Sequence, residues 1–153
     1  MTPQLDRALR NHAFVRGLND VELETLAELA TEVSFAEAEL ILTSGQRSKW
    51  FYLLIAGSVA VELRAPRYTV CVQALGPGEV FGWSSLLDEH NTLFQVRARE
   101  WTSALRFDGA ALQAKCRSDA HLGASIFHRA LQVVAGRVRA TELRFAEMCG
   151  VRV

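Results

Sequence analysis

The sequence predicts an α+β domain in which helices at both ends of the chain flank a sandwich or barrel of short strands. Between residues 33 and 107, short stretches of strand-forming residues follow one another at a spacing of roughly 8–12 residues, as in β-sandwiches and barrels. Two segments with helical spacing of apolar residues precede this region, and one long helical segment follows it. A chain of 153 residues is long enough for one such domain with an appended helix.

Two helices are expected at the N-terminus. Residues 4–16 place apolar side chains at a loose helical spacing, and Gly17 interrupts the pattern. Asn19 or Asp20 can cap a second helix, because either side chain accepts a hydrogen bond from the free N–H groups of a first helical turn. This second amphipathic helix is expected to end at about Thr31.

The central region is expected to form strands, because β-branched and aromatic residues are frequent there. Residues 50–55 are apolar on both faces, whereas Val59, Val61 and Leu63 alternate with polar or small residues, as in a strand with one buried face. The expected strands cover residues 33–35, 40–42, 50–55, 59–63, 68–72, 94–98 and 103–107.

A glycine-rich stretch interrupts these strands at residues 76–82 (Gly-Pro-Gly-Glu-Val-Phe-Gly). Three glycines and one proline in seven residues indicate a tight turn that needs unusual dihedral angles or close approach to other atoms. A short apolar helical turn is expected directly after it, at residues 83–87. The free N–H groups at the start of a helix point outward and can hold an anion, so the stretch predicts a binding site.

Two further helices are expected after the strands. Asp108 can cap a short helix over residues 109–116, and Asp119 can cap a long helix over about residues 120–148. One apolar stripe of the long helix repeats in steps of four and three residues, which is the heptad spacing of a coiled coil. This heptad seam consists of Phe127, Leu131, Val134, Val138, Thr141, Phe145 and Met148. A second stripe, here the inner stripe, consists of Leu122, Ile126, Ala130 and Val133.

A helix with two apolar stripes has two surfaces to pack against. We interpret one contact as the β-domain of the same chain and the other, at the heptad seam, as the same helix of a second subunit. The alternative is that both stripes are buried within one chain. The arginines of this helix are expected to lie on a solvated face interleaved with Glu142 and Glu147, or on a partner-binding surface: Arg129, Arg137, Arg139 and Arg144.

Composition excludes several classes of protein. The 17 basic residues balance the 17 acidic ones, so no excess of positive charge favours nucleic-acid binding. No apolar run reaches the ~18 residues of a membrane-spanning helix, and the N-terminus lacks a signal segment, so a cytoplasmic location is expected. Cys71, Cys116 and Cys149 lack metal-ligand spacing and are expected to be free thiols; a metal or iron–sulfur site is the alternative. We expect neither metal nor cofactor.

Four segments stand in an order that a known family also shows: Gly45, residues 51–59 (Phe-Tyr-Leu-Leu-Ile-Ala-Gly-Ser-Val), residues 75–82 and Val96-Arg97-Ala98. With them, the whole chain resembles the cyclic nucleotide-binding domain family, in particular the sensor half of the bacterial Crp/Fnr-type regulators. The resemblance implies an eight-stranded β-roll or jelly-roll barrel with two N-terminal helices and a short helix like a phosphate-binding cassette (residues 1–118), and a long C-terminal dimerisation helix (residues 119–153). Family members usually continue into a winged helix-turn-helix domain; the chain ends where that domain would begin, so specific DNA binding is not expected.

The resemblance implies a nucleotide pocket around the glycine-rich stretch, and this sequence departs from the family pattern there. Members follow Phe-Gly with a Glu that accepts a hydrogen bond from the ribose, and this position is Trp83. Members place an Arg for the cyclic phosphate further on, where this chain has Thr92 and Leu93. Bacterial receptors contact the base through hydroxyl groups of the long helix, where Val134 and Ala135 stand here. Cyclic AMP and cyclic GMP are therefore not expected to bind in the usual manner, because a buried phosphate without a cation is costly.

The candidate ligand-contact residues are those of a degenerate pocket: Val80, Phe81, Gly82, Trp83, Ser84, Ser85, Thr92, Leu93, Phe94 and Val134. Trp83 either fills this pocket or lines, with Phe81 and Phe94, an apolar pocket for an uncharged or flat ligand. The N–H groups of Ser84 and Ser85 offer a place for a small anion.

Other charged or titratable residues give weaker signals. Arg97 and Arg99 share one face of a strand and are expected to point outward, although either is a candidate to replace the missing cation. His121 and His128 share one face of the long helix; some relatives of this fold bind haem through a histidine, but we interpret both as solvated or helix-packing residues. Ser84 lies outside any G-x-S-x-G motif, and no catalytic histidine motif is present, so no enzymatic activity is expected.

Three functions follow from these expectations. The first is a non-enzymatic regulatory or sensor module with a degenerate nucleotide pocket, acting through dimerisation and protein–protein contact. The second is a receptor for a cyclic nucleotide or another small ligand that signals to a partner protein. The third is a DNA-binding-deficient chain that pairs with full-length Crp/Fnr-type regulators through the long helix.

Overall fold

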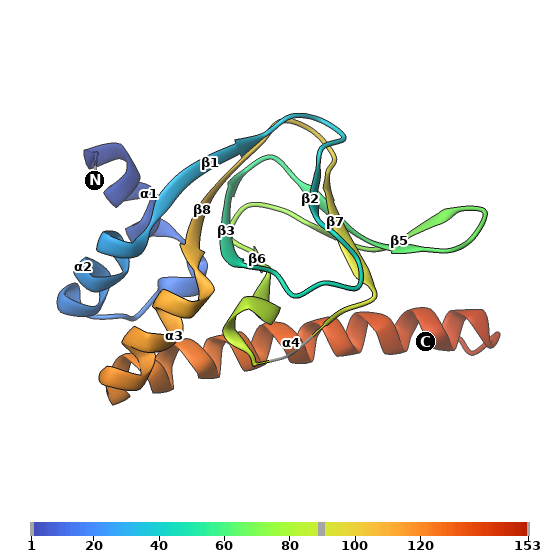
Figure 1. Ribbon diagram of the computed structural model, residues 1–153. Helices are drawn as coiled ribbons and strands as arrows, with labels where there is room; N and C mark the ends of the chain where they lie inside the picture. Colours follow the sequence, from blue (N-terminus) through green and yellow to red (C-terminus); the bar gives the residue numbers. More distant parts are fainter. Residues whose placement is uncertain (1, 89–90, 153) are drawn as a thin grey trace.

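The computed structural model describes residues 2–88 and 91–152 and shows two four-stranded antiparallel sheets that form a β-roll, with helices at one end and along one side (Figure 1). The expected domain ends Met1 and Val153 lie outside the described residues. The strands are β1 (Thr31–Phe35), β2 (Leu40–Leu42), β3 (Trp50–Ala56), β4 (Val59–Arg64), β5 (Thr69–Leu75), β6 (Val80–Phe81), β7 (Phe94–Ala98) and β8 (Thr102–Asp108). The helices are α1 (Pro3–Asn11), α2 (Asp20–Leu29), α3 (Gly109–Ser118) and α4 (Ala120–Met148), with the 3-10 turns η1 (Ala13–Val15) and η2 (Trp83–Leu86).

The strand orders confirm the expected eight-stranded β-roll. One sheet has the order β1-β8-β3-β6 and the other the order β2-β7-β4-β5. Strand β5 runs to Leu75, further than expected, because it stays paired with β4 beyond a bulge and places Leu75 opposite Val59. Helix α2 ends at Leu29, earlier than expected, because Thr31 already pairs with Arg106 in β1.

The N-terminal segment forms two short pieces rather than the single helix expected over residues 4–16. Helix α1 ends at Asn11 because His12 adopts an extended backbone and turns its side chain into the core. The Nε2–H of His12 donates to the carbonyl of Leu54 at 3.0 Å, and Nδ1 accepts from the N–H of Phe14 at 3.1 Å. The contact with Leu54 joins the N-terminus to β3, so the helix is interrupted by a tertiary interaction.

The expected helix caps are confirmed. Asn19 and Glu22 form a reciprocal capping box at the start of α2. Asp108 accepts a hydrogen bond from the N–H of Ala111 at 3.0 Å, and Asp119 accepts one from the N–H of Leu122 at 3.1 Å. These two caps begin α3 and α4 at the expected positions, and α4 covers the expected range.

The core divides into two apolar clusters, one on each side of β3. Phe51 and Leu53 face the helices, whereas Tyr52 and Leu54 face the interior of the β-roll. The expectation that this strand is apolar on both faces is therefore confirmed. One face of β3 packs against the helices, and the other packs against the second sheet.

Helix α4 runs along the base of the β-roll and continues past η2 to below the hairpin of β4 and β5 (Figure 1). Its inner stripe packs on the helix-side cluster, where Leu122 and Ile126 are completely buried. The heptad seam lies on another face and is largely exposed, with Leu131 at 65% and Met148 at 84% exposure. None of the helices within residues 2–88 and 91–152 is long and apolar enough to cross a membrane.

Candidate ligand-binding site

The glycine-rich turn leads into β6, an edge strand of the β-roll, and then into η2, which lies between the β-roll and α4 (Figure 1). Gly82 has φ +78°, and a Cβ at this position would lie 2.3 Å from the carbonyl oxygen of Trp50. Only glycine combines this left-handed conformation with such a close approach at low cost. Gly82 thus fixes the direction in which η2, and with it Trp83, leaves the sheet.

A small cavity lies between η2, the β-roll and α4, and it forms one part of the region where the family resemblance places the nucleotide. Its volume is about 40 Å³. That is room for about three water molecules, whereas small-molecule sites typically measure about 300–1,000 Å³. The cavity is lined by Leu42, Val61, Phe81, Gly82, Trp83, Ser84, Thr92, Phe94, Val96 and Arg137.

The structure brings some of the expected pocket residues together and separates others. Leu93 and Val134 lie along an open apolar groove of about 550 Å³ next to the small cavity, which they share with Trp83 and Phe94. Val80 faces a different cavity, between β5 and α4. Phe81 lines the small cavity while stacking on Tyr52, with ring centroids 4.6 Å apart.

The expectation that the N–H of Ser85 offers a place for a small anion is wrong. Its N–H donates to the carbonyl of Gly82 at 3.1 Å, and its hydroxyl donates to the same oxygen at 2.7 Å. The hydroxyl of Ser84 accepts from the N–H of Ser48 at 3.0 Å. The N–H of Ser85 therefore closes the 3-10 turn internally and is not available to a ligand.

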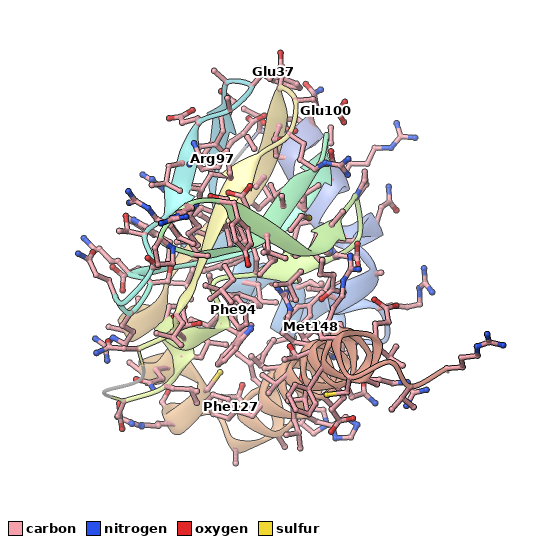
Figure 2. All side chains as sticks on the ribbon, turned by 90° about the vertical axis from the view of Figure 1, so that its right-hand side faces the viewer. Glu37, Phe94, Arg97, Glu100, Phe127 and Met148 are labelled. Carbon is pink, nitrogen blue, oxygen red and sulfur yellow. The ribbon has the colours of Figure 1, made fainter. Side chains whose placement is uncertain are left out.

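Arg97 does not replace the missing cation, consistent with its expected outward orientation. Its Nε lies 3.2 Å from Glu62 Oε1, and Nη1 donates to the carbonyl of Ala38 at 2.8 Å. In Figure 2, Arg97 and Glu37 lie toward the end of the β-roll that is remote from α4, whereas Phe94 lies close to α4. Arg99 follows β7 and is exposed.

The cation that lines the small cavity among the described residues comes instead from α4. Arg137 was expected on a solvated face, and this was wrong, because its side chain is 9% exposed and turned toward the β-roll. Arg129 is likewise engaged, donating to the carbonyls of Phe14 at 2.9 Å and Arg16 at 2.6 Å. The missed signal is the spacing: Arg137 continues the inner stripe, four residues after Val133.

Burial determines the electrostatics at Arg137. Desolvation lowers the pKa of its guanidinium, and the nearby carboxylate of Glu79 partly offsets this effect. Among the described residues Glu79 forms no ion pair, and its Oε2 accepts from the N–H of Gly76 at 2.7 Å. The guanidinium remains charged at neutral pH, because arginine is the most basic side chain and a lowered pKa still leaves it protonated.

The described contacts of His121 and the cysteines do not indicate a ligand or metal site. His121 forms an ion pair with the buried Glu22, and that hydrogen bond raises the His121 pKa. Cys116 is buried in the helix-side cluster, where desolvation raises its pKa to about 11, whereas Cys71 and Cys149 are exposed free thiols. Within the described ranges, no three His, Cys, Asp or Glu side chains are grouped as metal ligands would be.

Comparison with known proteins agrees with this architecture. No curated protein matches the chain. A solved structure from Geobacter metallireducens GS-15, assigned to the cyclic nucleotide-binding proteins, is 25% identical over 90% of this chain and 99% of that chain, with a TM-score of 0.76. A cyclic nucleotide-binding domain from Methylobacillus flagellatus KT is 19% identical over 95% of this chain and 84% of that chain, with a TM-score of 0.81. The N-terminal domain of a transcriptional regulator from Streptomyces coelicolor A3(2) is 22% identical over 90% of this chain and 94% of that chain, with a TM-score of 0.67.

The family match covers the β-roll and the start of the helical end. The sequence model described as "Cyclic nucleotide-binding domain" matches residues 32–119, which is more than half of the 153-residue chain. The strand order and the glycine-rich turn with η2 agree with that match, and the long terminal helix follows the matched residues. The chain belongs to the cyclic nucleotide-binding domain family.

Proposed function

We propose that the chain is a non-enzymatic regulatory module of the bacterial cytoplasm whose nucleotide pocket does not accept cyclic AMP or cyclic GMP in the family's usual manner. One observation carries this proposal: the cavity directly beside η2 has a volume of only about 40 Å³, and Leu93 and Val134 of the expected pocket line an open groove on the surface. Trp83 occupies the position of the ribose-binding Glu and borders that cavity. A nucleotide would have to displace this side chain, together with the packing that it makes against the core.

Charge supports the same proposal. A cyclic phosphate carries one negative charge, and its burial is favourable only beside a well-placed cation. Thr92 lines the cavity without a charge, and Leu93 is 74% exposed on the groove outside it. Arg137 comes from α4 and not from the segment of Thr92 and Leu93, which is where family members supply their arginine.

Isothermal titration with cyclic AMP and with cyclic GMP, followed in parallel by tryptophan fluorescence, tests this part of the proposal. We expect no heat of binding and no change of emission up to millimolar nucleotide. Micromolar binding of either nucleotide would overturn the proposal and would mean that Trp83 moves and another cation replaces the missing arginine. The Trp83→Phe variant identifies which emission change belongs to the pocket.

We further propose that the module acts as a homodimer through the heptad seam, with residues 1–118 as the regulatory unit and residues 119–153 as the dimerisation segment. The support is the row of exposed apolar side chains along α4, which repeats in heptads and has the chemistry of a helix–helix contact. The inner stripe of α4 packs on the core of the regulatory unit. A change in that unit would therefore alter the position of α4, and a partner protein would respond to that position.

Light scattering on a double variant tests the dimer. Val134→Asp with Val138→Asp places charges in the seam and should give a monomer, because buried unpaired carboxylates oppose association. Arg139→Asp is the matched control: it is exposed, lies outside the seam and changes the net charge by the same amount. An unchanged mass of the double variant would mean that the seam does not hold the subunits together.

A further inference from the structure

A second, larger cavity lies between α4, β5 and the turn before β6. Its volume is about 350 Å³, which falls within the range of small-molecule sites. Phe14, Leu75, Val80 and Val133 give it apolar walls, and Gly136 exposes the helix backbone to it. It lies beside, not within, the small cavity at η2, and Arg137 lines both.

Two polar groups at this cavity have no hydrogen-bond partner in the part of the chain that the structure describes. The guanidinium of Arg137 has no hydrogen-bond acceptor among residues 2–88 and 91–152, although the side chain is only 9% exposed. The Oε1 atom of Gln73, on β5, is buried and likewise accepts no hydrogen bond within the described part of the chain. Native proteins satisfy most buried polar groups, so a cation and an acceptor left open at one cavity call for an explanation.

The other charged groups at the cavity are already engaged. Arg129 donates to two backbone carbonyls, and Glu79 accepts from the N–H of Gly76 at 2.7 Å. With Arg129 and Arg137 against Glu79, the lining is net positive. Arg137 is thus the charged group of this cavity that can pair with a ligand. A ligand with a negative charge matches it.

We propose that this cavity binds a small organic anion, whose carboxylate or phosphate group pairs with Arg137 and whose hydrogen-bond donor pairs with Gln73 Oε1. The site differs from the family's nucleotide pocket, because its cation comes from α4 and its acceptor from β5. The proposal goes beyond the proposed function, because it concerns a second cavity. This cavity can bind a ligand even though the pocket at η2 does not accept cyclic nucleotide.

Binding at this site would act on the dimerisation helix. Arg137 stands between the seam residues Val134 and Val138, and Gly136 makes the helix locally less stable than alanine would. An anion held between Arg137 and Gln73 therefore ties this part of α4 to β5. Ligand binding would therefore change the orientation of the heptad seam relative to the β-roll, and a change of that orientation would alter ligand affinity.

Thermal unfolding of the full chain tests the proposal with two probes, inorganic phosphate and acetate, each compared with chloride at equal ionic strength. Arg137→Met should raise Tm in chloride, because it removes an unpaired buried charge, and should weaken anion binding at least about tenfold. Arg139→Met, on the exposed face of the same helix, should retain the wild-type response. Phosphate strengthens apolar burial in every variant, so only the difference between variants measures binding at Arg137.

The two probes separate the two sources of the ligand chemistry, since a response to phosphate alone indicates a phosphorylated ligand and a response to acetate indicates a carboxylate. Glu79→Gln should tighten binding of the probe, because the amide oxygen still accepts from Gly76 while the competing charge is lost. A lower Tm of Arg137→Met in chloride would give Arg137 a structural role and overturn the proposal. An equal anion response in Arg137→Met and wild type, or none in either, would mean an adventitious ion only and would also overturn it, whatever the cyclic nucleotide titration gives.

Discussion

Two leucines of α4 offer a direct test of how this helix is used. Leu122, on the inner stripe, is completely buried in the helix-side cluster, whereas Leu131, on the heptad seam, is 65% exposed within one chain. Truncating each to alanine removes the same atoms from the same helix. The two variants therefore differ in surroundings and not in chemistry.

The expected magnitudes follow from that burial. A fully buried Leu→Ala change costs about 2–5 kcal/mol, because it loses transfer free energy and leaves a cavity. For a domain of this size, about 3 kcal/mol corresponds to a fall of roughly 6–12 °C in Tm. Leu131→Ala removes mostly exposed atoms and should cost less than about 0.5 kcal/mol in the isolated chain.

Circular dichroism melts at a low and a high protein concentration, with light scattering at both, separate the two effects. Leu122→Ala should lower Tm at both concentrations and leave the mass unchanged. Leu131→Ala should lower Tm chiefly at the high concentration, where the dimer stabilises the fold by mass action. Equal shifts for the two variants at low concentration, or a shift below about 2 °C for Leu122→Ala, would refute this account of α4.

Burial lowers the pKa of His12, so the unfolded chain binds a proton that the folded chain does not, and the free energy of unfolding should fall as pH drops below 6.5; urea melts of wild type and His12→Gln check this. The hydrogen bond to Glu22 raises the pKa of His121, so its contribution should be present below 6.5 and lost as pH rises through the raised value; urea melts of His121→Gln should lack it. Gly82→Ala should destabilise the fold by roughly 2 kcal/mol or more in thermal melts, because it combines a left-handed backbone with a Cβ 2.3 Å from the Trp50 carbonyl.

Each of these variants is compared with a control, which is the wild-type pH profile for the histidines and a second glycine variant for Gly82. The two histidine effects have opposite signs, so a His12→Gln profile that matches wild type contradicts the first, and a His121→Gln profile that matches wild type contradicts the second. Gly45→Ala serves for Gly82, because Gly45 also has positive φ (+79°) but its added Cβ would meet no atom within 4 Å. Similar losses for the two glycine variants would show that close approach to Trp50 matters little.

Most of the fold was predictable because its signals are local. The Asn19–Glu22 capping box and the caps at Asp108 and Asp119 act over three residues, and the structure places all of them where the sequence predicts. The continuous apolar run at residues 50–55 likewise predicted a strand with two buried faces. The residues of the site were less predictable: Trp83 and Thr92 meet at one cavity, but Ser85 closes its own turn.

The sequence alone determined where α3 and α4 begin, most of the strands and the two apolar stripes of α4, and the family resemblance added that eight strands form a β-roll. Tertiary structure alone decided which long side chains turn inward. His12 breaks a helix for a carbonyl 42 residues away, and Arg137 lies toward β5 and η2, segments that precede it by more than fifty residues. Caps and periodicity depend on neighbours within one or two turns, whereas the burial of a polar side chain depends on which distant segments surround it.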